Sequence, residues 1–373
     1  MKESVSKKTL VIAGVSIIGF LISILVIVWI FSLFKPNYIS YEKFEEKVIT
    51  ATKKFYSDNP TLLPINDGEY SILYSTLQDN NYISPLNELL EDGDKCTIEI
   101  KIIKYEENFS YIPYLNCPGS YETKELYKVI TDNNSIVISG DGLYRANDNS
   151  LYYKGDIKNN YLMFGSIDNE KNILWRIISI DSDNNIKIIR TTATEETYTW
   201  DDRYNINKSS TTGYNDFEVS RLKETLQSFG TSELILTDAL KSKLVAKNLC
   251  VGKRNIKDTD NSGNIECSIM SEDKYLFGAL STYEYLRASL DENCNKISDK
   301  SCINYNYLPG FFKSTWAITA NNDTTHKVFY FSNSEVSDST ASNSKKIMVV
   351  TNLNNRVLYK SGNGSLSDPY IIK

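Results

Sequence analysis

The segment Asp258–Glu266 has the residue types and spacing of the first half of a calcium-binding loop. Oxygen ligands at alternate positions, followed by a glycine at the sharp turn, are what a hard cation requires. The candidate ligands are Asp258, Asp260, Ser262, Asn264 and Glu266. The twelfth position, which needs a bidentate glutamate, is Ile269, so an EF-hand is not expected. The sequence therefore predicts either an irregular calcium loop or a plain polar turn, and no other cofactor.

A second cluster, Trp200–Tyr204, joins an aromatic ring to carboxylates and a guanidinium in a segment expected to be a loop. Such side chains can stack on sugar rings and hydrogen-bond to their hydroxyls. The candidate ligand-binding residues are Trp200, Asp201, Arg203 and Tyr204. The alternative is a tryptophan that fills the edge of the core beside a surface ion pair.

The single histidine, His326, restricts the catalytic chemistry that this chain can perform. A zinc site with several histidine ligands cannot be built, and any Ser-His-Asp triad would have to include this residue. It lies in a polar turn, where a surface histidine is expected. The 47 Asp and Glu residues allow a glycosidase pair, but no spacing singles out two of them. We therefore assign no catalytic residue and expect a protein that is not an enzyme, with an envelope glycan hydrolase as the alternative.

An apolar run at residues 9–34, without any charged side chain, predicts where these residues are located. At about 1.5 Å per helical residue the run spans ~39 Å, enough to cross a ~30 Å hydrocarbon core. Lys2, Lys7 and Lys8 precede it, so residues 1–8 are expected in the cytoplasm and the bulk of the chain outside. A cleaved signal peptide is the alternative, but its apolar region is usually shorter and ends in small residues. We expect a single-pass membrane protein.

Six cysteines follow this run, an even number that is typical of disulfides in an extracytoplasmic segment. Proximity in the sequence favours the pairs Cys96–Cys117, Cys250–Cys267 and Cys294–Cys302. None forms a Cys-x-x-Cys pair, which argues against a zinc ribbon or a thioredoxin-type site. The formal net charge is −6 although the N-terminus is basic, so the outer surface is acidic and nucleic acid is not an expected partner.

The elements expected before residue 125 form a small helix-plus-sheet domain. Ser40 is a good N-cap for a helix that continues to Tyr56 and ends before Pro60. A short helix is expected in 70–82, and alternating residues predict strands at 97–103 and 109–115. A hairpin centred between residues 106 and 107 would place Cys96 opposite Cys117. We assign 38–125 to this domain and 126–142 to a linker.

Residues 143–373 are expected to form a larger domain rich in antiparallel strands. Three apolar runs, 161–164, 173–180 and 186–190, separated by polar turns, predict a meander. Helices are expected at 217–229 and 234–249, and later strands at 275–280, 328–331 and 346–350.

Several stretches of this domain resemble a family of surface domains from low-GC Gram-positive bacteria: 175–178, 186–190, 198–200, 280–285 and 362–372. That family resembles the formylglycine-generating-enzyme and C-type-lectin-like group, which implies a lectin-like α+β architecture. Residues 9–125 are similar to pilin-like stalks. The prepilin sequence Gly-Phe-Thr-Leu-Ile-Glu is absent, and no cysteine pair is placed as a copper site, so neither pilin processing nor copper-dependent oxidation is implied.

Together these features predict an α+β surface protein with an N-terminal transmembrane helix, a pilin-like domain and a larger disulfide-bonded domain. The expected function is non-catalytic binding of an envelope glycan, a wall polymer or a protein. A structural component of an envelope assembly is a further alternative.

Overall fold

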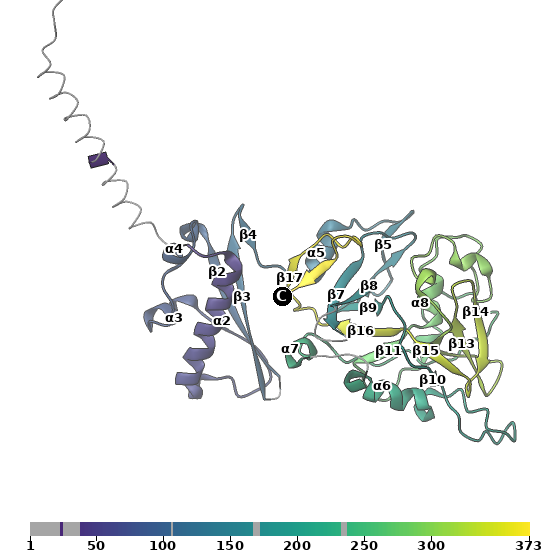
Figure 1. Ribbon diagram of the computed structural model, residues 1–373. Coiled ribbons are helices and arrows are strands. Elements are labelled where there is room, and N and C mark those ends of the chain that lie inside the picture. The colour runs from purple at the N-terminus through teal and green to yellow at the C-terminus, as the bar shows by residue number, and fades with distance from the viewer. Residues whose placement is uncertain (1–22, 25–37, 106, 167–171, 233–236) are drawn as a thin grey trace, which may run out of the picture. The chain divides into compact units, whose positions relative to one another are not determined.

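The computed structural model describes residues 23–24, 38–105, 107–166, 172–232 and 237–373, and the chain divides into two compact units, 1–123 and 124–373 (Figure 1). The expected cytoplasmic tail 1–8 and membrane anchor 9–34 lie outside the described residues, apart from helical Ser23 and Ile24. Within the described part of the chain, no helix is both long enough and apolar enough to cross a membrane.

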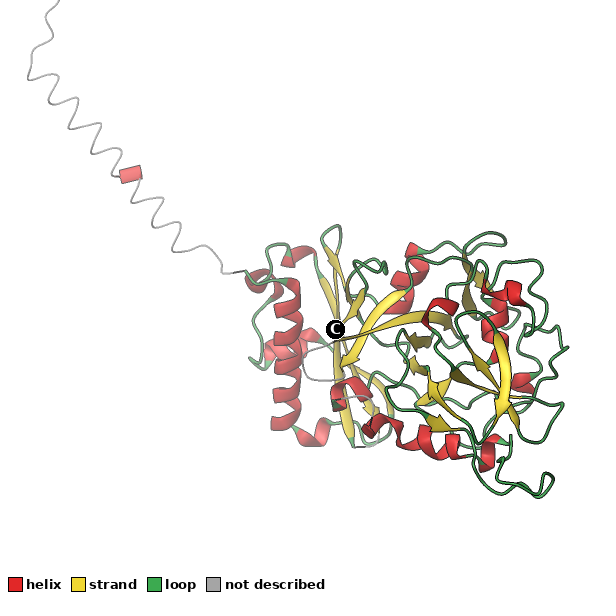
Figure 2. Ribbon diagram, turned by 45° about the vertical axis from the view of Figure 1, so that its right-hand side comes forward, coloured by secondary structure: helices red, strands yellow, loops and turns green. Residues whose placement is uncertain are grey.

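The N-terminal unit is organised by helix α2 (Tyr41–Asp58), which begins and ends where the sequence predicts. The Ser40 hydroxyl accepts a hydrogen bond from the Lys43 amide, and Pro60 prevents the helix from continuing. Helical spacing gathers its apolar side chains on one buried face: Phe44, Val48, Ala51 and Phe55. Figure 2 shows α2 lying along the four-stranded sheet of this unit.

That sheet has the strand order β1-β2-β3-β4 and confirms the predicted hairpin. Its strands are β1 (Gly68–Ile72), β2 (Thr97–Tyr105), β3 (Asn108–Cys117) and β4 (Tyr121–Glu122). Tyr105 pairs with Asn108 and Thr97 with Asn116, so the register is centred between residues 106 and 107. Cys96 and Cys117 therefore meet at the open end of the hairpin, where they form a disulfide with a Cα–Cα distance of 4.2 Å.

The helix expected in 70–82 is shorter than predicted, because residues 68–72 form edge strand β1 and α3 covers only Tyr74–Asp79. Leu77 is fully buried, whereas Leu73, expected on the same inner face, is 72% exposed. Leu73 is the N-cap residue and has extended dihedral angles, so it does not share the helical face. Helix α4 (Leu86–Leu89) and 3-10 turns at Pro60–Leu62 and Gly93–Lys95 complete the unit.

The C-terminal unit contains two sheets. The strands are β5 (Gly142–Arg145), β6 (Leu151–Lys154), β7 (Tyr161–Ser166), β8 (Asn172–Ile180), β9 (Ile186–Arg190), β10 (Tyr198–Thr199), β11 (Phe277–Ala279), β12 (Thr315–Ala320), β13 (Lys327–Phe331), β14 (Val336–Thr340), β15 (Ser344–Ile347), β16 (Val349–Leu353), β17 (Tyr359–Ser361) and β18 (Tyr370–Ile372). The larger sheet has the order β11-β16-β9-β8-β7-β18-β17, with β6 pairing β8 and β5 pairing β6; the smaller has the order β10-β15-β12-β13-β14.

The predicted meander is present as β7, β8 and β9, each antiparallel to the next. These strands supply fully buried Trp175 and Ile177 to the core of this unit, and β12 supplies Trp316. The indole N–H groups are not orphaned, because Trp175 donates to the Phe164 carbonyl and Trp316 to the Tyr198 carbonyl. The mixed α+β class is therefore as expected, with sheets predominating.

Helical segments of this unit differ from the expected ones in several places. Ser220 divides the helix expected at 217–229 into a 3-10 turn and a helix, and the helix at 282–287 was not expected. The predicted linker contains helix α5 (Leu126–Asn133), whose residues Leu126, Val129 and Ile130 are buried in the core of the C-terminal unit. The predicted second helix is reduced to α7 (Asp238–Lys241), because the following residues form backbone bridges to strands instead. The remaining helices are α6 (Arg221–Ser232), α8 (Thr282–Arg287) and 3-10 turns at Phe217–Val219, Glu266–Ser268, Lys300–Ile303 and Pro309–Phe311.

The exposure of Leu73 and the burial of Leu77 provide a matched test of the N-terminal unit. We expect Leu77→Ala to destabilise the unit by about 2–5 kcal/mol, because it removes buried methyl groups and leaves a cavity. Leu73→Ala should change the free energy of unfolding by less than about 0.5 kcal/mol. The two changes in the free energy of unfolding can be measured by urea denaturation of the full chain, with hydrogen exchange of the amides in 41–58 as the probe of this unit. Equal effects of the two substitutions would contradict this packing.

Candidate functional site

The predicted ligand-binding cluster is divided by the structure between the interior and the surface. Trp200 is fully buried, donates its indole N–H to the Ala317 carbonyl at 3.3 Å, and packs edge-on against Phe217. Its ring faces therefore offer no surface on which a sugar could stack. Tyr204 is 58% exposed and lies just before the turn at residues 206–209.

Asp201 and Arg203 hold this turn together. The Asp201 carboxylate is buried, and it accepts hydrogen bonds from the Arg203 Nε at 2.8 Å and the Tyr214 amide at 2.7 Å. Gly213 lies in the left-handed region at φ 72°, and a Cβ there would meet the Asp201 carbonyl oxygen at 1.9 Å. Asp201 thus acts as a structural anchor of the turn, and the neighbouring carboxylate, Asp202, is the one that faces outward.

Asp202 lies in an open polar groove between α6 and the ends of β10 and β15. Arg221, on α6, connects the two sides: its Nε donates to Asp202 Oδ1 at 3.1 Å, and its Nη1 donates to Glu224 Oε2 at 3.1 Å. The three charged side chains are each about half exposed. Hydrogen bonds to Asp202 and then Glu224 raise the pKa of Arg221, so its guanidinium stays charged.

The rest of the groove is lined mainly by hydroxyl-bearing side chains, and its volume is about 450 Å³. These residues are Thr197, Tyr198, Thr199, Thr225, Ser228 and Ser344. The Thr225 hydroxyl donates to the Arg221 carbonyl, which leaves its oxygen lone pairs available as acceptors. The groove therefore offers a guanidinium donor, two carboxylate acceptors and several hydroxyls within one rigid surface.

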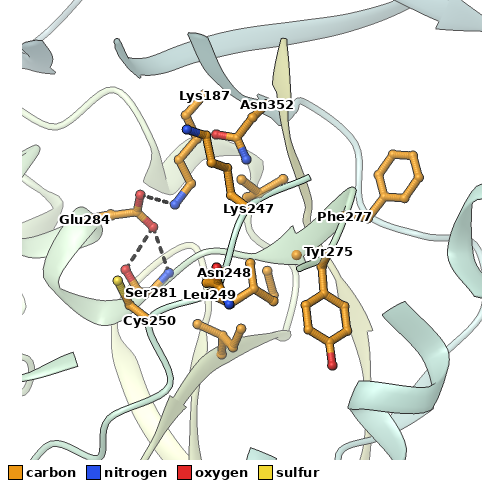
Figure 3. Close-up of a pocket in the computed structure, with 14 residues that line it drawn as sticks. Lys187, Lys247, Asn248, Leu249, Cys250, Tyr275, Phe277, Ser281, Glu284 and Asn352 are labelled. Carbon is orange, nitrogen blue, oxygen red and sulfur yellow. Dashed lines mark hydrogen bonds and ion pairs between the residues drawn. The ribbon is translucent and has the colours of Figure 1, made fainter. Parts of the chain in front are cut away.

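A second, more enclosed site is a cavity of about 180 Å³ at the β11 edge of the larger sheet (Figure 3). Its apolar side is formed by the side chains of Leu249, Ile318 and Val350. The β11 residues Phe277 and Ala279 also border it, but their side chains project from the opposite face of the sheet, where Phe277 packs against Phe229. Lys187 and Asn352 pair directly across β9 and β16, so both side chains project from the same face. Lys247 and Asn248 enter from the segment before the Cys250–Cys267 disulfide.

The charged groups at this cavity are held in fixed positions by short contacts. The buried Glu284 carboxylate accepts from Lys187 Nζ at 2.5 Å and from the Ser281 hydroxyl at 2.8 Å, as the dashed lines in Figure 3 show. Burial alone would raise the pKa of Glu284, but Lys187 and Arg287 outweigh it, and the net shift is downward. Glu284 is therefore an ionised carboxylate at neutral pH, and Lys187 is its counter-ion.

The segment Asp258–Glu266, predicted as a calcium loop or a polar turn, is organised around the buried guanidinium of Arg254. Glu266 accepts from Arg254 Nε at 2.8 Å and Nη2 at 3.1 Å, and neither side chain is exposed. The carbonyls of Asp258 and Asp260 accept from Nη1 at 3.1 Å and Nη2 at 2.5 Å. The remaining candidate ligands take part in turn hydrogen bonds, in which Asp260 accepts from Ser262 and Ser262 accepts from the Asn264 amide. An internal cation thus occupies the centre of this loop.

The other groups that could carry chemistry are engaged in structure or lack a partner. All three disulfides that sequence proximity favours are formed. Asp92 lies beside the cystine of Cys96 and Cys117, whose sulfurs are therefore not free to bind a metal. Burial and then Lys208 lower the pKa of His326, and its Nδ1 has no hydrogen-bond partner among the described residues, so no carboxylate orients it as a triad requires.

The residues of the cavity and most of those of the groove could not be identified from the sequence. Lys187, Lys247, Glu284 and Asn352 come from four separate segments that only the folded sheet brings together. One local signal was present: Ser281 and Glu284 are spaced as a capping box, which the structure contains at the start of α8. Asp202 belonged to the cluster singled out, but nothing in the sequence connected it with Arg221.

No protein-family model matches the chain, no curated protein matches it, and no solved structure matches its fold. The candidate sites must therefore be interpreted from their own geometry.

The buried ion pair of Arg254 and Glu266 predicts an asymmetric response to substitution. Arg254→Met leaves the Glu266 carboxylate buried without a counter-ion and should destabilise the C-terminal unit by about 3–5 kcal/mol. Replacing both partners, with Arg254→Met and Glu266→Leu, should cost less than the single change, because no unpaired charge remains. Urea denaturation of the full chain measures the difference, with Arg221→Met as a surface control. A double variant less stable than the single one would contradict this interpretation.

The same geometry predicts that calcium does not stabilise the protein. Arg254 already binds the Glu266 carboxylate and two loop carbonyls, so these oxygens are not available to a metal ion. The melting temperature of the full chain should be unchanged between excess calcium and a chelator. A calcium-dependent rise that Asp260→Asn abolishes would instead establish the loop as a calcium site.

Proposed function

We propose that this chain is a membrane-anchored, extracytoplasmic surface protein whose C-terminal unit binds a neutral envelope glycan without catalysis. The observation that carries the proposal is the open groove of hydroxyls around Asp202, Arg221 and Glu224. Sugars present many hydroxyl groups, each able to donate and to accept. A groove that offers fixed donors and acceptors side by side is complementary to such a ligand.

The rigidity of the groove supports this proposal. Arg221 joins a helix to the β10 segment, and the Leu222 amide donates to the Trp200 carbonyl at 3.0 Å, so both walls are tied to the core. Side chains that are already ordered lose little entropy on binding. The two carboxylates and one guanidinium leave a net negative charge, which disfavours polyanions and agrees with the acidic composition of the chain.

The location proposed for the protein rests on sequence and covalent chemistry. The uncharged run 9–34 with its preceding lysines has the length and flanks of a signal anchor. Three disulfides, with no free cysteine among the described residues, agree with an oxidising compartment. The lectin-like character of the C-terminal unit and the pilin-like character of the N-terminal unit remain proposals that follow from the sequence resemblance.

Two variants of one groove test this function. We expect the full chain to bind a subset of neutral envelope glycans on an array, and Arg221→Met to weaken that binding at least about tenfold, because a charge-assisted hydrogen bond is lost. Glu224→Gln should weaken it as well, whereas Glu195→Gln, an exposed glutamate outside the groove, should leave it unchanged.

The other outcomes each assign a different function. Binding that survives Arg221→Met would place the glycan elsewhere on the protein. Release of reducing ends from a bound polysaccharide would instead favour a glycan hydrolase. If the unmodified chain binds no glycan on the array, glycan binding is excluded, and a protein partner or a structural role in an envelope assembly is favoured.

A further inference from the structure

The cavity at the edge of the larger sheet lies where Leu249 packs closely on a glycine of β11. Gly278 pairs directly with Val350 of β16, and a Cβ at Gly278 would meet Leu249 Cδ2 at 3.0 Å. Residues directly opposite one another in an antiparallel pair project from the same face. The absence of a side chain at Gly278 therefore lets Leu249 approach β11, and Leu249, Ile318 and Val350 border the cavity together.

The size of this space limits the ligand to a small molecule. Its volume is about 180 Å³. A dry cavity of ~150 Å³ accommodates a benzene-sized molecule, so this one holds about six to eight non-hydrogen atoms. The interior of a polysaccharide chain cannot enter it, so the cavity has a function separate from glycan binding in the groove and does not depend on that proposal.

The polar side of the cavity carries more hydrogen-bond donors than the protein uses. Each lysine ammonium has three donors. Lys187 uses one on Glu284, and Lys247 contacts Asp181 at 2.9 Å and Asp183 at 3.5 Å, so both retain donors without an acceptor among the described residues. Asn352 lies beside both lysines in Figure 3, and its side-chain amide has no partner among the described residues.

Two of the three charged side chains that line the cavity are cationic, and Lys247 is also paired with Asp181 and Asp183, which lie outside the lining. Lys187 and Lys247 contribute two ammonium groups, and Glu284 contributes one carboxylate. Because Glu284 already accepts from Lys187 and twice from Ser281, it is not available to a ligand cation. The donors face an anion, and the apolar wall faces a hydrocarbon body.

We propose that this cavity binds a small carboxylate with a compact aliphatic body, either a free acid or the C-terminal residue of a peptide. The carboxylate accepts hydrogen bonds from Lys187, Lys247 and the Asn352 amide. The aliphatic part packs against Leu249, Ile318 and Val350.

Isovalerate and its neutral isostere isovaleramide test this recognition on the full chain by isothermal titration and ligand-observed NMR. We expect saturable binding of isovalerate and at least about tenfold weaker binding of the amide, because the charge-assisted hydrogen bonds are lost. Equal binding of acid and amide, or no saturable binding of either acid or peptide, would overturn the proposal. The dipeptide glycylvaline and its C-terminal amide distinguish a free acid from a peptide terminus. Binding of glycylvaline but not of its amide would indicate a peptide terminus, and binding of isovalerate alone would indicate a free acid.

Three variants locate the binding. Lys247→Met and Asn352→Asp should each weaken isovalerate binding at least about tenfold, the first by removing a donor and the second by adding a like charge. Gly278→Val should abolish it, because the added side chain displaces Leu249 and so changes the cavity wall. Lys360→Met, which changes an exposed lysine outside the cavity, should have no effect. Unchanged far-ultraviolet circular dichroism and melting temperature would show that each variant is folded, and binding that survives Gly278→Val would exclude this cavity.

Discussion

The buried guanidinium of Arg254 connects the parts of the C-terminal unit on which the candidate cavity depends. Its carboxylate partner, Glu266, also accepts from the Thr282 hydroxyl at 2.6 Å, and Thr282 is the first residue of α8. The same helix start carries Ser281 and Glu284, which fix Lys187 at the cavity. The position of a cavity lysine therefore depends, through three polar contacts, on an ion pair that is inaccessible to water.

The backbone of the same segment extends this influence toward the groove. The Arg254 amide donates to the Ala320 carbonyl and its carbonyl accepts from the Asn322 amide, which fixes the turn after β12. That turn accepts hydrogen bonds from buried Asn215, whose neighbour Tyr214 donates to Asp201. Burying so many polar groups costs desolvation energy, and a hydrophobic replacement could be equally stable. The network instead defines a unique arrangement for loops that contain no regular secondary structure, and the two nearby disulfides restrict the unfolded chain.

The features that could be predicted from the sequence are those set by local periodicity. Helix α2, the β2–β3 register and the β7–β9 meander each follow from the spacing of apolar residues within about twenty positions, and the short disulfide loops follow from proximity.

The errors arise where tertiary contacts override local pattern. Leu126, Val129 and Ile130 have helical spacing within a segment rich in turn residues, and only the core of the C-terminal unit shows why they form a helix. Trp200 and Asp201 have the composition of a surface site, yet a tryptophan that loses all contact with water gains more free energy inside the core.

The groove and the cavity differ in charge because their cationic side chains have different carboxylate partners. In the groove, one exposed arginine contacts two carboxylates, so the site is negative and its donors are already shared. In the cavity, Lys187 is paired with a buried carboxylate and Lys247 with two aspartates outside the lining, so both ammonium groups keep donors for a ligand. Solvent and salt weaken electrostatic interactions with the exposed charges of the groove. Interactions with the charges of the cavity are stronger, because its apolar wall has a low dielectric constant. A neutral, hydroxyl-rich ligand therefore suits the groove, and a small anion suits the cavity, so one compact unit can distinguish two classes of ligand without using the same residues for both.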